Sequence, residues 1–250
     1  MKPIKNQTYN NVYYKSSTIP KGTYAELGTI EKDSTGLYGK HISEEFRGKK
    51  ILDKLLQDPK INNFKNILDI GAGECKQSDY LRKHNKKVYT CDFGEKGTHC
   101  DHLKYNYDYV GNFLDINFDK QFDVTLASHI LEHQINPNIF LKKLSSVTKE
   151  SGHIVIIIPP RKPFITGGHF SIWNAGLVLY NLVMAGINCS TCYIKQYDYN
   201  IGLIIQNNTF NIDSIPLKYD QYDIEKYLLP YFPDIINSEP FNGDILTYNW

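Results

Sequence analysis

The sequence predicts an α/β protein built on a mostly parallel sheet of seven strands, with helices on both faces and an antiparallel hairpin that closes the sheet. Two observations lead to this prediction. Short apolar, strand-like runs alternate with helix-like segments between residues 66 and 158. Later, two strand-like runs are separated only by a tight turn at residues 198–200, and a connection this short allows only antiparallel pairing.

Seven segments have the apolar or β-branched character of strands, namely 66–70, 87–92, 107–110, 122–128, 153–158, 190–197 and 201–206. Four segments have helical spacing, namely 43–56, 74–84, 138–150 and 173–185. Gly152 and Gly186 are expected to close the last two helices. We predict an N-terminal cap or lid over residues 1–60, a core over 61–207, and a C-terminal extension over 208–250 with one short helix near 223–229.

Composition narrows the class of protein. The chain has 250 residues, of which 41% are hydrophobic and 22% are charged, as is typical of a globular protein. A net charge of +1 argues against a nucleic-acid partner, because such binding depends on a basic excess. The chain contains no apolar run of about 20 residues and no secretory signal, and its five cysteines are an odd number. We therefore predict a cytoplasmic protein without a membrane span or disulfides, and the oligomeric state stays open.

The first candidate site residues follow the first predicted strand. Parallel sheets bind ligands beyond the carboxyl ends of their strands. Asp69 ends the first strand, and Gly71 and Gly73 permit a tight turn and the close approach of a ligand. Lys76 stands where a dinucleotide fingerprint has its third glycine, and Glu74 would repel a phosphate, so a pyrophosphate is disfavoured here. A plain strand–helix turn is the alternative.

The second and third strands also end in candidate residues. Asp92 lies about 20 residues beyond the first glycine, where a carboxylate can accept hydrogen bonds from ribose hydroxyls. After the third strand, Asn112 or Asp115 could accept a hydrogen bond from an adenine amino group and Phe113 could cover its ring. A polar loop with a core phenylalanine is the alternative there.

Histidines follow the fourth and fifth strands. His129 and His133 lie four residues apart, so on a helix they would share a face. We predict no metal site, because a zinc-binding HExxH motif has Glu after its first His, whereas Glu132 precedes the second, and no third ligand has diagnostic spacing. His169 follows two glycines on a loop at the ligand edge and is a candidate general base, with a helix cap as the alternative. Cys189 and Cys192 are predicted to be buried thiols.

Several of these motifs together resemble class I S-adenosylmethionine-dependent methyltransferases. The resemblance spans roughly residues 64–206 and is carried by Ile67–Glu74, Asp92, Phe122-Asp123 and Leu131-Glu132-His133. It implies a Rossmann-like fold and S-adenosylmethionine as cofactor, with S-adenosylhomocysteine as product. The cofactor site that it implies comprises Asp69, Gly71, Gly73, Glu74, Asp92, Phe93, Asn112, Phe113, Ser128 and His129.

The family assigns roles to these positions. By the resemblance, Gly71 and Gly73 lie against the methionine part of the cofactor and Asp92 holds the ribose. Ser128 and His129 face the sulfonium. The family usually has Asp where this chain has Asn112, which weakens the implied contact of Asn112 and Phe113 with adenine.

A narrower resemblance concerns the acceptor. The runs at residues 128–134, 167–169 and 173–177 are similar to methyltransferases of bacterial capsule or lipopolysaccharide clusters. This implies O-methylation of a sugar or a sugar-linked group, on a small-molecule or glycan acceptor.

The residues that handle the acceptor depend on its charge. A hydroxyl acceptor needs a base, for which the candidates are His169, His129 and His133, in that order. An anionic acceptor, such as a phosphate or phosphoramidate oxygen, would instead be positioned by Arg161 and Lys162.

Two other functions compete with methyl transfer. An NAD-dependent oxidoreductase is opposed by the missing third glycine and by the closing hairpin. A catalytically silent scaffold subunit is opposed by the intact glycine and aspartate positions of the cofactor loop.

Overall fold

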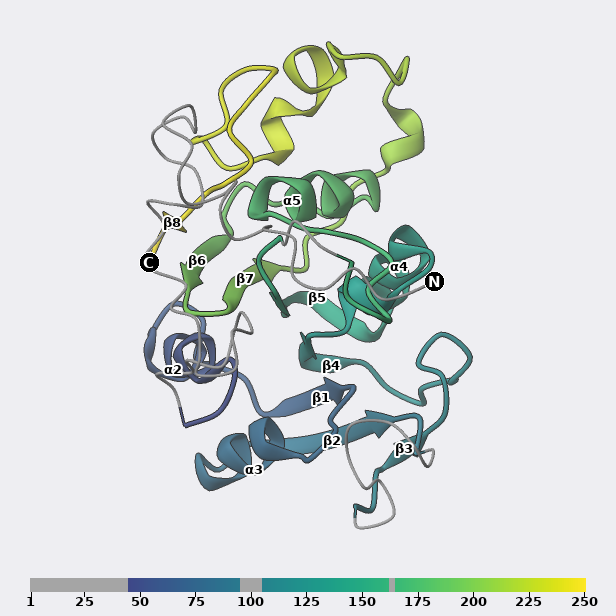
Figure 1. Ribbon diagram of the computed structural model, residues 1–250, viewed down its shortest axis with the longest axis vertical. Helices are drawn as coiled ribbons and strands as arrows, with labels where there is room; N and C mark the ends of the chain where they lie inside the picture. The colour runs from purple at the N-terminus through teal and green to yellow at the C-terminus, as the bar shows by residue number, and fades with distance from the viewer. Residues whose placement is uncertain (1–44, 95–104, 162–164) are drawn as a thin grey trace, which may run out of the picture. The chain divides into compact units, whose positions relative to one another are not determined.

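The computed structural model describes residues 45–94, 105–161 and 165–250, and residues 44–250 form one compact unit. This unit contains a single sheet of eight strands in the order β3-β2-β1-β4-β5-β7-β6-β8 (Figure 1). The strands are β1 (Asn66–Ile70), β2 (Lys87–Asp92), β3 (Tyr109–Val110), β4 (Phe122–Ser128), β5 (Thr148–Ile158), β6 (Tyr193–Tyr197), β7 (Asn200–Gln206) and β8 (Thr247–Tyr248).

The pairing pattern agrees with the predicted fold class. Strands β1 to β5 pair in parallel, and β7 pairs antiparallel with both β5 and β6. The predicted mostly parallel sheet with a closing antiparallel hairpin is therefore confirmed. The predicted number of seven strands was wrong by one, because Thr247 and Tyr248 of the C-terminal extension pair with β6 as an additional strand.

Helices cover both faces of the sheet, as predicted. They are α2 (Lys49–Gln57), α3 (Lys76–Lys83), α4 (Pro137–Val147) and α5 (Ala175–Met184). Along β5, Val155 and Ile157 belong to the core formed with α2 and α3, whereas Ile154, Ile156 and Ile158 belong to the core formed with α4 and α5. This alternation explains why β5 is a continuous apolar run, since both of its faces are buried.

The end of α4 differs from the prediction. The helix was expected to continue to residue 150 and to be closed by Gly152, but it ends at Val147, and Thr148 already pairs with Phe122 of β4. Gly152 lies inside β5, where a Cβ atom would come within 2.7 Å of the carbonyl oxygen of Asp123. This glycine therefore serves the close approach of two strands and does not end a helix.

Helix α2 is part of the core, although the sequence placed it within the N-terminal segment 1–60. Its residues Ile51, Leu52 and Leu55 are fully buried. Gly202 of β7 provides the space for Ile51, because a Cβ atom at Gly202 would lie 2.0 Å from Ile51 Cδ1. The remainder of the predicted cap, residues 1–44, lies outside the described residues.

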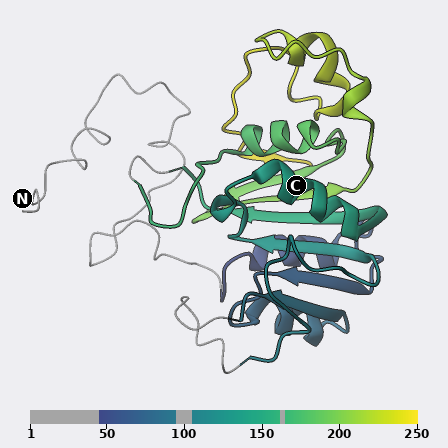
Figure 2. The same cartoon turned by 90° about the vertical axis from the view of Figure 1, so that its right-hand side faces the viewer.

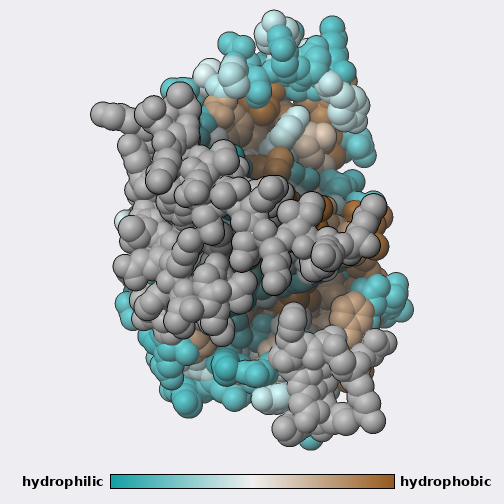
Figure 3. Space-filling view, in the orientation of Figure 1, coloured by the Kyte–Doolittle hydropathy of each residue, from teal (hydrophilic) through white to brown (hydrophobic). Residues whose placement is uncertain are grey.

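The C-terminal extension packs beside α5 in both views (Figures 1 and 2). Gly176 N donates a hydrogen bond to Gly243 O at 2.8 Å, and a Cβ atom on Gly176 would lie 2.6 Å from Gly243 Cα. In the space-filling view, apolar side chains are visible between this extension and the rest of the unit, and hydrophilic ones cover its outer surface (Figure 3). The buried apolar residues of the extension are Ile224, Leu228, Phe232, Ile236 and Ile245.

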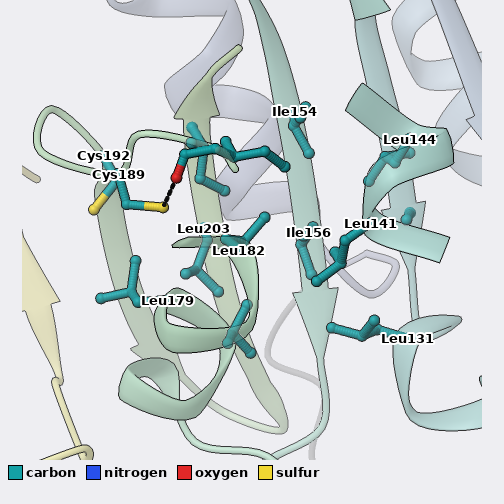
Figure 4. Close-up of a cluster of buried hydrophobic side chains, with 14 of the residues drawn as sticks. Leu131, Leu141, Leu144, Ile154, Ile156, Leu179, Leu182, Cys189, Cys192 and Leu203 are labelled. Carbon is teal, nitrogen blue, oxygen red and sulfur yellow. Dashed lines mark hydrogen bonds between the residues drawn. The ribbon is translucent and has the colours of Figure 1, made fainter. Parts of the chain in front are cut away.

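The cysteine pair lies inside the α5-side core, next to Leu179, Leu182 and Leu203 (Figure 4). Cys189 and Cys192 are both fully buried and free. Burial raises the pKa of the Cys192 thiol to about 12. The prediction of buried thiols is confirmed.

Among the described residues, the helices are all too short or too polar to cross a bilayer.

Candidate functional site

The register of the sheet brings the predicted site residues to one edge. Ile70 at the end of β1 pairs with Cys91 of β2 and with Ala127 of β4. Ser128 at the end of β4 pairs with Ile157 of β5. The segments that follow these strands therefore meet at the carboxyl edge, where α/β sheets bind ligands.

The turn after β1 has no space for a side chain at Gly71. Gly71 and Gly73 adopt left-handed backbone conformations, with φ of 69° and 51°. The backbone N–H groups of Gly71 and Ala72 both donate to the carbonyl of Cys91, at 2.8 and 3.2 Å. A Cβ atom at Gly71 would lie 2.0 Å from Ile130 Cδ1. Glycine is thus required at this position both by the backbone angle and by the neighbouring side chain.

Asp92 is fixed beside this turn. Its carboxylate accepts a hydrogen bond from Gly73 N at 2.9 Å, and its backbone carbonyl accepts one from Gly111 N at 2.9 Å. The residue is only 8% exposed. Tyr107, which the sequence analysis did not single out, donates from its hydroxyl to Gly73 O at 2.8 Å. The glycine turn is therefore held from β2 and from the segment before β3.

Asp69 lies under α3. It is 1% exposed, and Ser78 Oγ of α3 donates to Asp69 Oδ2 at 2.6 Å. Burial raises the pKa of the Asp69 carboxyl to about 6, while the Ser78 hydrogen bond and the charge of Arg82 act in the opposite direction. Its principal contact therefore joins β1 to α3 below the glycine turn.

Three other predicted cofactor residues have different surroundings. The Glu74 carboxylate is partly exposed and pairs with Lys76. Phe93 is 55% exposed at the end of β2. Asn112 organises its own loop, because its side-chain amide donates to Asp115 at 3.0 Å and its oxygen accepts from Leu114 N at 3.2 Å.

Phe113 is a core residue. It is 6% exposed, and its ring packs edge-on against Phe140 with a centroid distance of 5.3 Å. The structure therefore agrees with the alternative that the sequence left open at this position, a polar loop with a core phenylalanine.

The segment after β4 is not an α-helix, so His129 and His133 do not share a helix face. His129 has a φ of 57°, and Leu131–His133 is a 3₁₀ turn. His129 Nε2 lies 2.9 Å from Asn200 Oδ1, whereas His133 Nδ1 lies 2.7 Å from the carbonyl oxygen of Gly168. The two rings are thus engaged by different segments of the chain.

A buried carboxylate lies between the histidines. Glu132 is 1% exposed, and its Oε1 is 3.4 Å from His129 Nδ1 and 3.9 Å from His133 Nε2. The His169 ring is perpendicular to that of His133, with centroids 4.8 Å apart. Phe170 N donates to Glu132 O at 2.9 Å, which ties the loop after β5 to this turn. The three candidate histidines therefore gather around Glu132.

The tip of the β6–β7 hairpin also reaches this site. Asn200 is fully buried against His129, and the Tyr199 ring is stacked on the His129 ring at 6.1 Å. The Arg47 guanidinium lies over Tyr199, 5.3 Å from the ring centroid. The antiparallel pairing of β7 with β5 is the signal that could have located these residues, because it sets the start of β7 beside the end of β5.

Ser128 and Arg161 have partners of their own. Gln77 Nε2 donates to Ser128 Oγ at 3.3 Å and to Arg47 O at 3.2 Å. Arg161, a candidate for holding an anionic acceptor, forms an ion pair with Asp244 of the C-terminal extension at 2.6 Å. Its predicted companion Lys162 lies outside the described residues.

Known proteins resemble the part of the chain that forms this edge. Residues 68–156 match a family model described as a methyltransferase domain. This part of the chain is similar to that family. The matched segment extends from β1 into β5 and therefore includes the glycine turn, Asp92 and the Glu132 turn. No curated protein matches the chain.

Solved structures resemble the methyltransferase domain in fold. One is an S-adenosylmethionine-dependent methyltransferase from Archaeoglobus fulgidus, at 16% identity and a TM-score of 0.50, covering 64% of this chain and 91% of that one. Another is an O-methyltransferase family protein from Burkholderia thailandensis, at 13% identity and a TM-score of 0.50, covering 66% of this chain and 57% of that one.

The edge of the sheet fits S-adenosylmethionine, the cofactor that the sequence resemblance implies. The left-handed backbone of Gly71 and Gly73 forms a tight turn at this edge, beside which a ligand can lie. At Gly71 itself, Ile130 Cδ1 fills the space of a Cβ atom. Asp92 supplies a carboxylate, an acceptor suited to ribose hydroxyls. The same turn lacks the third glycine that favours a pyrophosphate, as the sequence indicated.

Proposed function

We propose that this methyltransferase O-methylates a sugar or a sugar-linked group on a small-molecule or glycan acceptor in the cytoplasm of a bacterium that builds a surface polysaccharide. The observation that carries the chemical part of this proposal is the gathering of His129, His133 and His169 around Glu132, at the same sheet edge as the glycine turn. The likeness of the segments around His169 and Trp173 to capsule and lipopolysaccharide methyltransferases supports the acceptor class.

The residues proposed to hold the cofactor lie on β1, β2 and β4. Gly71 and Gly73 line the methionine part with bare backbone, and Asp92 accepts hydrogen bonds from the ribose hydroxyls. The exposed ring of Phe93 offers an apolar face to adenine, a role that the buried Phe113 ring does not offer. Ser128 and His129 face the sulfonium. Asp69 and Glu74 support the turn from below and from its outer side.

The acceptor half of the site needs alignment and a base. When bound, the cofactor supplies a methyl group already activated by the sulfonium, so the protein mainly has to place the acceptor oxygen in line and exclude water. We propose that His169 takes the proton of an acceptor hydroxyl, because it lies on the loop after β5 and its unperturbed pKa is near neutrality. Two buried polar groups of the same loop, Ser171 Oγ and Trp173 Nε1, have no hydrogen-bond partner among the described residues. Such groups suit a polar acceptor.

The contacts of Arg161 favour a hydroxyl acceptor over an anionic one. A phosphate or phosphoramidate oxygen needs no base but needs a cation, and the guanidinium of Arg161 is paired with Asp244. The histidine group, in contrast, offers the proton acceptor that a hydroxyl requires.

Two measurements test the proposed function. S-adenosylhomocysteine should raise the melting temperature of the purified protein and NAD should not, whereas stabilisation by NAD would support an oxidoreductase. Tritium from methyl-labelled S-adenosylmethionine should pass into a carbohydrate-containing fraction of an extract of the producing cell. If the protein binds S-adenosylhomocysteine but labels no component of the extract, it is a scaffold subunit. Label in protein or nucleic acid alone would overturn the acceptor class.

A further inference from the structure

Three side chains at the acceptor end of the site can reach one ion. A carboxylate oxygen of Glu132 and a ring nitrogen from each of His133 and His169 all lie within 4.8 Å of one another. They come from two segments, the 3₁₀ turn after β4 and the loop after β5. Two hydrogen bonds tie these segments together, Phe170 N to Glu132 O at 2.9 Å and His133 Nδ1 to Gly168 O at 2.7 Å.

The carboxylate of Glu132 needs a partner. It is 1% exposed, and neither of its oxygens forms a hydrogen bond within the described part of the chain. The nearest side-chain nitrogens are His129 Nδ1 at 3.4 Å and His133 Nε2 at 3.9 Å from Oε1. A buried ionised carboxylate without hydrogen bonds is costly, and a cation at this place removes that cost.

The His133 ring has the orientation of a metal-binding histidine. A carbonyl oxygen can only accept a hydrogen bond, so the 2.7 Å contact with Gly168 O places the ring proton on Nδ1. The lone pair is then on Nε2, the nitrogen that faces Glu132. Histidines that bind metals commonly donate their other N–H to a backbone carbonyl in this way. Gly168 permits the contact, because it has a φ of 80° and a Cβ atom there would lie 3.3 Å from His133 Nδ1.

We propose that Glu132, His133 and His169 bind a divalent transition-metal ion, with Zn²⁺ the best suited. Two imidazoles and one carboxylate are a common ligand set for catalytic zinc, and such sites leave a position open for water or substrate. Ligand atoms about 2.0–2.2 Å from the metal are roughly 3.3–3.6 Å apart in a tetrahedral site. Side-chain rotations that move the ligand atoms by about 1 Å would therefore complete the site.

This inference changes the sequence-based prediction of no metal. That prediction examined His129 and His133 as a possible pair of metal ligands. In the structure, His129 contacts Asn200, and His169 from the next loop lies beside His133 instead. If the proposed methyl transfer is correct, the open position would bind the acceptor oxygen. The metal would lower the pKa of the acceptor hydroxyl, and His169 would act through the metal instead of taking the proton itself.

Metal binding is tested without cofactor or acceptor, so its failure is separate from failure of the proposed function. The full chain, free of any polyhistidine tag and stripped with a chelator, is titrated with Zn²⁺ by calorimetry and with Co²⁺ by absorption spectroscopy. We expect one ion per chain, Co²⁺ bands of low coordination number and a higher melting temperature with Zn²⁺. Loss of an outer-shell partner costs about 10–100-fold in affinity, so His133→Ala and His169→Ala should each cost more than about a hundredfold.

Two further variants complete the design. Glu132→Gln keeps the side-chain shape and should also lose the ion, and its melting temperature without metal reports whether it folds. His84→Ala, on the exposed end of α3, is the matched control and should bind the ion normally. If the wild-type protein binds no ion, or if the His133 and His169 variants bind as tightly as His84→Ala, the proposal is wrong. Glu132 then has His129 Nδ1, at 3.4 Å, as its nearest side-chain partner among the described residues. Retained binding of S-adenosylhomocysteine in that case would leave the proposed function standing.

Discussion

The backbone N–H of Gly73 and the carboxylate of Asp92 are joined by a 2.9 Å hydrogen bond, so the turn after β1 and the end of β2 form one unit. A substitution at either residue therefore acts on both. A variant that tests ligand binding at Asp92 must therefore keep the hydrogen bond to Gly73 N, so that the geometry of the turn is unchanged.

Asp92→Ala should weaken binding of S-adenosylhomocysteine by at least about tenfold, because each lost charge-assisted hydrogen bond to the ribose is worth about 1.5–3 kcal/mol. Asp92→Asn keeps an oxygen that can accept from Gly73 N, so it should retain the melting temperature and lose only part of the affinity. Calorimetry and thermal unfolding of both variants make the comparison, with the exposed Asp79→Ala as control. An Asp92→Ala protein that folds and binds normally would refute the ribose assignment.

Gly71→Val should be severely destabilised, since its side chain would occupy the position of Ile130 at a left-handed φ. Gly73→Val should fold better but fail to bind the cofactor. Gly167→Ala is the matched control, because no atom lies within 4 Å of a Cβ placed there. Urea unfolding and calorimetry distinguish the two effects. Normal cofactor affinity in Gly73→Val would show that the turn does not face the ligand.

His169→Ala should lower turnover by at least about a hundredfold while cofactor affinity is unchanged, because loss of a general base costs roughly 10²–10⁴ in rate. His169→Gln can orient a hydroxyl but cannot take its proton. Activity kept in the Gln variant and lost in the Ala variant would assign orientation alone. Full activity in both would make His169 structural and transfer the role to His129.

Asp69 should make the protein less stable as the pH rises from about 4 to about 6. Its pKa is about 6 in the folded protein and 3.8 in the unfolded chain, so in this range the folded state holds a proton that the unfolded state has lost. The shift corresponds to at most about 3 kcal/mol. Urea unfolding of Asp69→Asn should lack this fall in unfolding free energy, whereas Asp79→Asn, exposed on α3, should keep it. A fall of the same size in Asp69→Asn would contradict the shift.

Deletion of residues 1–40 tests the predicted lid. Residues 44–250 form one compact unit with α2 in its core, so the truncated protein should fold and melt within a few degrees of the full chain. Arg47 and Ser128 share the Gln77 side chain as partner, so residue 47, just before α2, lies at the carboxyl edge of the sheet. We expect impaired turnover with little change in stability. Normal turnover of the truncated protein would show that residues 1–40 do not act as a lid.

The fold could be predicted where burial alone determines the local structure. The apolar run of β5 predicted a strand buried on both faces, and the short connection before β7 predicted antiparallel pairing. The end of α4 at Val147 and the start of β5 at Thr148 could not be predicted, because they depend on the pairing of Thr148 with Phe122. Strand β8 has two residues and no pattern of its own, so only its pairing with β6 defines it.

In the candidate site too, some features could be predicted from the sequence and others could not. The rule that ligands bind after parallel strands located Gly71, Asp92 and the three histidines. It did not reveal the direction of each side chain, so Phe113 is in the core and His129 contacts Asn200. Tyr107 joins the site only through a tertiary contact, which no sequence spacing encodes. The place of Asn200 could have been inferred from the antiparallel pairing of β7 with β5.

The position of β7 between β5 and β6 has a consequence for biosynthesis. β6 leaves the ribosome before β7 and β8. In the described sheet, however, it pairs only with these two later strands. The nascent chain therefore exposes β6 and the open edge of β5 until residue 206 has emerged. A chaperone that binds extended apolar segments would find its target in this interval. Stalled chains from which residue 197 but not residue 206 has emerged should be the most aggregation-prone.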